Sequence, residues 1–275
     1  MNAIVAPRSD YFGMPRARAV TLARGAILLA MATAFDLYAR FFGDPGFVQP
    51  LSAIARAAIN PVFSDARIVG ALGLAAFEIA VAYALSIVVG AIIGLAVGST
   101  KFARLSFLPI VLLLYAIPQV SLMPLFILVF GLGVASKIAF GFSHGVFPVI
   151  VNVVAGMRDI NPLYLRGARC MGATRADVLR HVVFPNMVPT FFVGLRLAMT
   201  MTLLGVILAE LYVSTEGVGY FTKLYAESYN PAPLFALIGA LALIAFLFNM
   251  LVRMVERRLT PGADSACRPI GTKQT

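Results

Sequence analysis

Four ionisable residues lie within or at the ends of long apolar stretches of this sequence: Asp36, Glu78, Arg196 and Glu210. If these stretches cross a bilayer, each charged group must face protein, water or a lipid headgroup, because a charge in lipid is energetically costly. Buried carboxylates could relay protons or ions. For Arg196 two interpretations stay open, pairing with an acidic residue or contact with an anionic substrate. Glu210 lies close in sequence to tyrosines at the end of its stretch, which favours a role in loop architecture.

Two further polar residues could line a pathway through apolar helices. Tyr115 and Gln119 are four residues apart in an apolar stretch that contains Pro109, Pro118 and Pro124. Prolines remove a helical hydrogen bond and clash with the preceding turn, so kinks or breaks are expected there. Alternatively, both side chains form hydrogen bonds with backbone groups that a kink leaves unpaired, which explains their presence equally well.

Other chemistry is poorly represented. The sequence has no serine–histidine pair, no metal-binding cluster and no paired carboxylates with suitable spacing for catalysis. It also lacks a glycine-rich loop ending in Gly-Lys-Ser or Gly-Lys-Thr, the motif that cradles ATP phosphates. His144 and His181 are far apart, and Cys170 and Cys267 are expected to stay reduced. We therefore expect no enzyme activity, no metal and no cofactor in this chain.

The longest polar segment between apolar stretches, residues 158–187, is predicted to fold. Asn161 can cap a short helix that begins with a proline, and Gly172 can end that helix in the left-handed conformation. Thr174 and Asp177 form a capping-box pattern that begins a second helix, expected to end near Pro185.

The surface of this helix-turn-helix combines arginines and small residues with the apolar Leu163, Leu165 and Met171. Such a surface suits docking to a soluble protein. The alternative is that these apolar side chains are buried against the membrane-embedded part of the same chain.

The elements around these residues are predicted to be membrane-spanning helices. Hydrophobic residues make up 60% of the 275 residues and charged residues 12%, with a mean hydropathy of +0.91. A soluble domain carries about twice that charged fraction. Apolar runs of about twenty residues suit helices that satisfy their own backbone groups in lipid, which disfavours a barrel. The expected all-α, polytopic fold has six spans, at 24–42, 69–97, 107–130, 138–157, 188–211 and 233–254.

The net charge of +10 reflects membrane topology rather than nucleic-acid binding. Lysine and arginine gather in the amino-terminal segment, the turn at 99–104, the loop at 158–187 and the tail from residue 253, and cytoplasmic loops carry such an excess. Both termini are therefore expected in the cytoplasm. The first apolar run is long enough to span, so we interpret it as a retained helix and not a cleaved signal peptide.

Small residues recur at one-turn spacing in the second span, at Gly90, Gly94 and Gly98. This spacing allows a neighbouring helix to approach closely. Ordinary helix packing is the preferred explanation, ahead of a specific dimer contact.

The loop resembles the signature of the transmembrane subunits of bacterial ATP-binding-cassette importers. That signature is Glu-Ala-Ala, three residues, Gly, nine residues, Ile, one residue and Leu-Pro. Every spacing matches here, with the family's positions occupied by Arg166-Gly167-Ala168, Gly172, Val182 and Phe184-Pro185. Arginine in place of the family's glutamate leaves open whether this position contacts the partner ATPase.

The resemblance extends to the nitrate, sulfonate, taurine and bicarbonate branch of these permeases. The matching stretches are Ile117-Pro118-Gln119, Leu122-Met123-Pro124-Leu125, Phe130-Gly131-Leu132-Gly133, Gly194-Leu195-Arg196, Ala209-Glu210-Leu211 and Glu216-Gly217-Val218-Gly219-Tyr220. It implies a type I importer-like permease fold, divided into a cytoplasmic segment, a first helix with its outer loop, the permease core with its coupling loop, and a cytoplasmic tail. These parts are 1–23, 24–66, 67–259 with 158–187, and 260–275.

The resemblance also implies a function and partners. The chain would be the permease subunit of an importer for a small anion, working with a second permease chain, an extracytoplasmic binding protein and a cytoplasmic ATPase dimer that binds ATP and Mg²⁺. A pyrimidine-like or aromatic substrate is the alternative within this class, and an ion-coupled secondary carrier is the alternative outside it. The residues implied at the ATPase interface are Leu163, Arg166, Gly167, Ala168, Arg169, Gly172, Ala173 and Pro185.

Overall fold

Every regular element among the described residues is a helix. A computed structural model describes residues 16–44, 46–213 and 217–259. The expected terminal segments 1–23 and 260–275 lie mostly or wholly outside these residues, as does Cys267. In the described part of the chain no strand occurs, and the predicted all-α fold class is confirmed.

The chain forms two compact units. Among described residues, the first unit comprises 16–44, 46–64 and 225–237, and the second comprises 65–213, 217–224 and 238–259. The first unit holds α1 (Arg16–Phe41), α2 (Leu51–Ala57) and the kinked segment η1 (Ala58–Val62), in which Asn60 has a non-helical φ of −136° and ψ of 118°. Both α10 (Val218–Glu227) and α11 (Pro231–Leu259) contribute residues to each unit.

Asp36 organises the first unit. Its Oδ2 accepts a hydrogen bond of 2.6 Å from Arg40 Nε, one helical turn further on, and its Oδ1 accepts one of 2.8 Å from the backbone N–H of Leu51. The carboxylate therefore joins α1 to the first residue of α2, and this ionisable side chain faces protein as expected.

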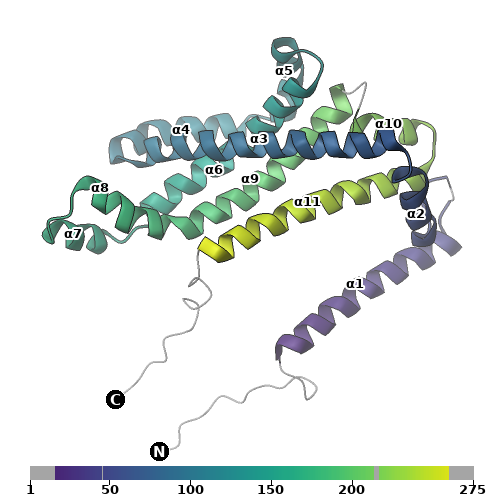
Figure 1. Cartoon of the computed structure of the whole chain (residues 1–275), viewed down its shortest axis with the longest axis horizontal. Coiled ribbons are helices and arrows are strands. Elements are labelled where there is room, and N and C mark those ends of the chain that lie inside the picture. Colours follow the sequence, from purple (N-terminus) through teal and green to yellow (C-terminus); the bar gives the residue numbers. More distant parts are fainter. Residues whose placement is uncertain (1–15, 45, 214–216, 260–275) are drawn as a thin grey trace, which may run out of the picture. The chain divides into compact units, whose positions relative to one another are not determined.

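The second unit contains the elements from α3 to α9 (Figure 1). They are α3 (Ala66–Gly98), α4 (Lys101–Ala116), the 3₁₀ turn η2 (Gln119–Leu122), α5 (Met123–Phe130), α6 (Val134–Arg158), α7 (Pro162–Cys170), α8 (Arg175–Val178), the π-helical turn η3 (Leu179–Val183) and α9 (Phe184–Val213). The residue before α3, Asp65, caps that helix by accepting a hydrogen bond of 2.9 Å from Arg67 N–H.

Five helical segments are long and apolar enough to cross a membrane. They are Ala19–Phe41, Ala66–Gly98, Val134–Arg158, Ala176–Tyr212 and Pro231–Glu256. The predicted third span is the exception, because α4 and the segment Gln119–Phe130 meet the same test only as a pair bent by 80°. With that pair counted as one span, the number reaches the predicted six.

The break in the third span lies at one of the three prolines. Ile117 and Pro118 adopt extended backbone conformations between α4 and η2. A residue before proline is pushed away from the helical conformation, which explains the position of the break. Pro109 stays inside α4, and Pro124 lies in the first turn of α5, where a missing N–H is harmless.

The core of the second unit forms where α3, α6 and α9 pack against one another. Fully buried apolar side chains from all three helices meet there: Ile79 and Ala82 of α3, Val149 and Val153 of α6, and Ala198, Met199 and Val206 of α9. The core is contributed by one face of each helix, whereas large apolar side chains on other faces are exposed, as lipid contact requires.

Glycines bring α3 into direct contact with α6. A Cβ atom at Gly90 would lie 2.7 Å from Val149 Cβ, and one at Gly94 would lie 2.7 Å from Val153 Cβ. At Gly98 the same atom would be 2.6 Å from Met157 Sδ. The small-residue series therefore serves packing within this chain, as preferred from the sequence.

Replacing Gly94 by leucine should disrupt this contact. The new side chain has no room against Val153, so we expect the Gly94→Leu variant to lose roughly 1–3 kcal/mol of stability. Thermal unfolding of the detergent-solubilised chain measures this loss. Gly73→Leu on the same helix is the matched control, since nothing lies within 4 Å of a Cβ atom there. Equal stability of the two variants would contradict the packing role of Gly94.

Candidate functional site

The loop between α6 and α9 is a folded surface element. Asn161 Oδ1 accepts a hydrogen bond of 2.9 Å from Leu163 N–H and caps α7, which begins at Pro162. Gly172 has a φ of +80°, and its N–H donates to the Arg169 carbonyl at 3.0 Å. The predicted first helix and its left-handed glycine stop are confirmed.

The predicted capping box after Gly172 is also present. The backbone N–H of Thr174 donates to Asp177 Oδ2 at 3.0 Å, and the N–H of Asp177 donates to Thr174 Oγ1 at 3.3 Å. These reciprocal bonds satisfy the first donors of α8.

The second helix of the loop does not end near Pro185, and that prediction was wrong. The chain passes from α8 through η3 directly into α9, with Pro185 in the first turn of α9. In the π-helical turn each N–H reaches one residue further back than in an α-helix, so the register shifts ahead of the proline. Asn186 Nδ2 donates to the Val182 carbonyl at 2.7 Å and satisfies an acceptor in this region.

Short helix α7 exposes apolar side chains. Leu163 is 62% exposed, and Met171, which follows the helix, is 84% exposed. Leu165 is half-buried, and Ala168 is the buried residue of the helix. In the described residues most of this apolar surface is therefore uncovered, which favours docking over burial against the same chain.

The other residues implied at the loop surface differ in exposure. The exposed residues are Arg166, Gly167, Arg169, Gly172 and Pro185, whereas Ala173 is half-buried. Arg166 makes no ion pair with another residue that the structure describes. The loop thus presents a mixed basic and apolar surface around α7.

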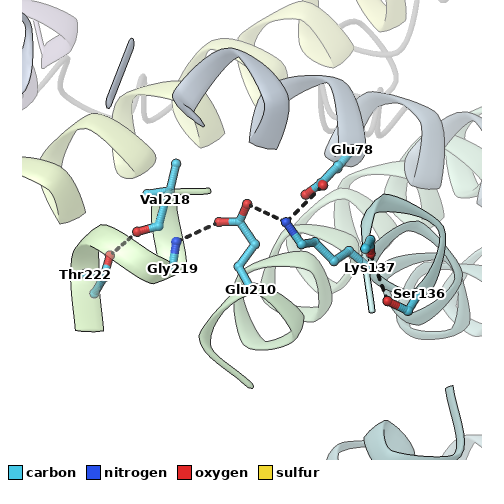
Figure 2. A network of polar contacts seen from close by, with 8 residues as sticks. Glu78, Ser136, Lys137, Glu210, Val218, Gly219 and Thr222 are labelled. Atoms are coloured by element: carbon cyan, nitrogen blue, oxygen red, sulfur yellow. Dashed lines mark hydrogen bonds and ion pairs between the residues drawn. The ribbon is translucent and has the colours of Figure 1, made fainter. Parts of the chain in front are cut away.

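A buried ionic cluster lies at the other end of the α6–α9 pair (Figure 2). Lys137 Nζ, in the first turn of α6, lies 3.1 Å from Glu78 Oε1 of α3 and 3.4 Å from Glu210 Oε1 of α9. Glu210 Oε2 accepts a hydrogen bond of 3.0 Å from the backbone N–H of Gly219, at the start of α10. All three side chains are almost completely buried.

Lys137 was missed as a site residue from the sequence, where it counted only as a loop charge. Two acidic residues in apolar helices without an identified cation were the available signal, because buried carboxylates require a partner. Glu210 lies in the cluster that joins α9 to α10, in agreement with the loop-architecture role favoured from the sequence.

Arg196 is paired instead with an acidic residue of α11. Its Nη1 lies 3.2 Å from Glu256 Oε2, and the two side chains are 36% and 22% exposed. The sequence left open whether Arg196 pairs with an acidic residue or contacts an anionic substrate, and the structure shows it paired with an acidic residue. Arg196 and Glu210 are separated by about 21 Å along α9, at 1.5 Å per residue.

Tyr115 and Gln119 flank the break between α4 and η2 and contact the same face of α6. The Tyr115 ring stacks on Phe147 with centroids 5.6 Å apart, and Gln119 Oε1 accepts a hydrogen bond of 3.4 Å from Ser143 Oγ. The structure therefore brings this pair together, whereas Arg196 and Glu210 have partners of their own elsewhere.

No metal centre is formed by the described residues, where no group of three or more His, Cys, Asp or Glu side chains could hold an ion. His144 Nδ1 lies 3.0 Å from the Phe140 carbonyl, and His181 Nδ1 lies 3.2 Å from the Asp177 carbonyl, both one turn back in their helices. Cys170 is a free, exposed thiol.

Comparison with known proteins identifies the family. Residues 86–261 match the family model of binding-protein-dependent transport system inner membrane components. The taurine transport system permease protein of Escherichia coli is 29% identical over 90% of this chain and 91% of its own length. A putative aliphatic sulfonates transport permease protein of Bacillus subtilis is 30% identical over 71% of each chain, and a nitrate import permease protein of Synechocystis is 25% identical over 79% of this chain and 80% of its own. The chain therefore belongs to the inner membrane components of binding-protein-dependent transport systems, as an ABC importer permease of the taurine, sulfonate and nitrate branch.

Proposed function

We propose that this chain forms the pathway by which a small organic or inorganic anion, such as a sulfonate, taurine, nitrate or bicarbonate, is imported across the inner membrane. ATP hydrolysis in a partner subunit drives the import, and ATP and Mg²⁺ bind to that partner. The observation that carries the ATP coupling is the loop at α7, which is folded by its own caps and exposes apolar side chains. The choice of a small anion rests on the similarity to taurine, sulfonate and nitrate permeases.

The ATPase partner follows from this loop, and the other partners follow from the family. A cytoplasmic ATPase dimer binds the surface around α7, a second copy of the permease completes the pathway, and an extracytoplasmic binding protein delivers the anion. The positively charged segments at 99–104 and 158–187 lie in the cytoplasm together with both termini, in accord with the distribution of lysine and arginine.

Coupling requires that α7 move with the helices that cross the membrane. The loop leaves α6 at Arg158 and enters α9 without a helix break after Arg175, and α6 and α9 are closely packed. Closure of the ATPase dimer on nucleotide would carry α7 and this helix pair as a rigid body between inward-facing and outward-facing states.

The pathway itself is assigned to the region of the bent third span. Tyr115 and Gln119 lie at the break, where backbone groups leave the helical pattern and polar side chains meet α6. The guanidinium of Arg196 is partly exposed and is paired with Glu256, so this pair is close to neutral and the arginine would have to leave Glu256 to bind an anion. Glu210 is buried and acts through the cluster with Lys137 rather than by direct contact with a passing anion.

A second candidate exists for the transported substrate. A formylaminopyrimidine transport permease protein of Halalkalibacterium halodurans is 27% identical over 85% of this chain, which keeps a pyrimidine-like or aromatic substrate as the second candidate. The family match argues against the ion-coupled secondary carrier considered from the sequence, which would need no ATPase.

Substrate class can be tested by reconstitution. We expect proteoliposomes with the permease, its ATPase and its binding protein to import radiolabelled taurine or another small anion only with internal ATP. Measured uptake of an uncharged pyrimidine with no anion uptake would support the second candidate. ATP-independent uptake driven by an ion gradient would contradict the proposed class.

An aspartate at the exposed apolar position of α7 should weaken ATPase binding. We expect Leu163→Asp to reduce co-purification of the ATPase subunit about tenfold, since a buried apolar contact is worth at least about 1.4 kcal/mol. Arg166→Glu on the same helix is the matched control and should leave assembly intact. If both variants assemble normally, α7 is not the docking surface; loss with Arg166→Glu alone would mean that the arginine makes the specific contact.

The turn at Gly172 should be needed for coupling. A φ of +80° strains any branched or bulky residue, and nothing in the described chain lies within 4 Å of a Cβ atom there, so the cost is in the backbone. We expect Gly172→Leu to insert but to lose most uptake and stimulated ATPase activity, measured in proteoliposomes. Gly172→Asn, which tolerates this conformation, should retain both. Normal coupling in a well-inserted Gly172→Leu protein would refute this role.

A further inference from the structure

The cluster around Lys137 contains one more acidic group than it has cations. Glu78, Lys137 and Glu210 are 0%, 3% and 1% exposed. Among the described residues, each of the two carboxyl groups makes its ion pair with the same ammonium group, at 3.1 and 3.4 Å. If all three groups were ionised, the cluster would carry one uncompensated negative charge.

Such a charge is strongly disfavoured at this position. The cluster lies between α3, α6 and α9, within helices that cross the bilayer, where neither water nor lipid can solvate it. Binding a single proton makes the cluster neutral, with one carboxylic acid, one carboxylate and one ammonium.

Hydrogen bonding distinguishes the two carboxyl groups (Figure 2). Glu210 accepts from Lys137 Nζ through Oε1 and from the Gly219 N–H through Oε2, an arrangement that suits an anion. Neither oxygen of Glu78 takes part in a hydrogen bond with the described residues, although Oε1 is 3.1 Å from the ammonium. A hydrogen on Glu78 removes its charge, so that only one carboxylate has to be stabilised by Lys137.

The backbone at the start of α10 lies directly against Glu210. A Cβ atom at Gly217, where φ is +113°, would lie 2.8 Å from Glu210 Oε1, and one at Gly219 would lie 2.4 Å from the Glu210 carbonyl carbon. Only glycine allows this approach, and it keeps solvent away from the cluster. The neighbouring Ser136 does not donate a hydrogen bond to the cluster, because its Oγ donates to the Gly133 carbonyl at 2.8 Å.

We propose that Glu78, Lys137 and Glu210 form a proton-binding site that holds one proton on Glu78. The neutral acid allows Glu210 to stay ionised and to fix the start of α10 through Gly219. This inference does not depend on the identity of the transported substrate or on the ATPase.

Infrared difference spectroscopy of the full-length permease in lipid nanodiscs tests the site. A carboxylic acid gives a C=O stretching band that is separate from carboxylate bands and shifts in D₂O. We expect one such buried acid in the wild type, none in Glu78→Gln, none in Glu210→Gln because Glu78 then ionises to balance Lys137, and two in Lys137→Met. Glu256→Gln, which removes a carboxylate paired with Arg196, is the control and should leave the band unchanged.

Thermal unfolding of the same samples locates the proton. The amide of Glu78→Gln resembles the neutral acid, so its Tm should stay within about 3 °C of the wild type. Glu210→Gln should lose more, because it removes the anion that Gly219 and Lys137 bind. The double variant Glu78→Gln/Glu210→Gln leaves Lys137 without an anion and should fall by about 10 °C, with recovery on adding Lys137→Met.

Three results would overturn the proposal. Absence of a carboxylic acid band in the wild type means that no proton is held. A stable Glu210→Gln variant with a destabilised Glu78→Gln variant places the proton on Glu210. If sodium raises the Tm of the wild type and no carboxylic acid band is seen, the cluster binds a metal cation instead of a proton.

Discussion

The close approach of α3 to α6 is the constraint on which the second unit depends. In lipid there is little hydrophobic driving force between helices, so contact depends on van der Waals packing at small residues. Gly90 and Gly94 place the α3 backbone against Val149 and Val153, and Gly141 and Gly145 face Val206 and Thr202 of α9 in the same way. With three helices packed this tightly, side chains from each can meet in one small buried space, and the cluster around Lys137 occupies such a space.

Local sequence signals predicted the elements well because each depends on a few neighbouring residues. Runs of apolar residues predicted where the spans lie, but not all of their ends: the first span begins at Ala19 instead of residue 24, and the fifth begins at Ala176 instead of residue 188. Asn161, Gly172 and the pair Thr174–Asp177 act through backbone groups within four residues, and all three features form as predicted. The bend of the third span follows from Pro118 by the same local reasoning, although its 80° angle does not.

Features that join distant residues could not be predicted in this way. Lys137 contacts residues 59 and 73 positions away, and no local pattern specifies which cation a buried carboxylate meets. The prediction that the helix ends near Pro185 was wrong for a different reason. A proline usually ends a helix, but here the π-helical turn η3 changes the hydrogen-bond register before the proline, so the helix continues. The exposed face of α7 could be anticipated as apolar, but only the fold shows that it stays uncovered by the rest of the described chain.

The two functional regions are linked by the same pair of helices. At one end α6 and α9 connect to the loop that carries α7, and at the other end Lys137 and Glu210 join them to α3 and to the start of α10 (Figure 1). Glycines keep the two helices in contact between these ends, so neither can move alone without losing buried packing. If α7 binds an ATPase as proposed, a displacement of α7 would be transmitted along this packed pair of helices rather than absorbed by a flexible linker. The continuous helix through η3 fits this proposal, because a helix break near Pro185 would separate the loop from α9 where that displacement has to pass.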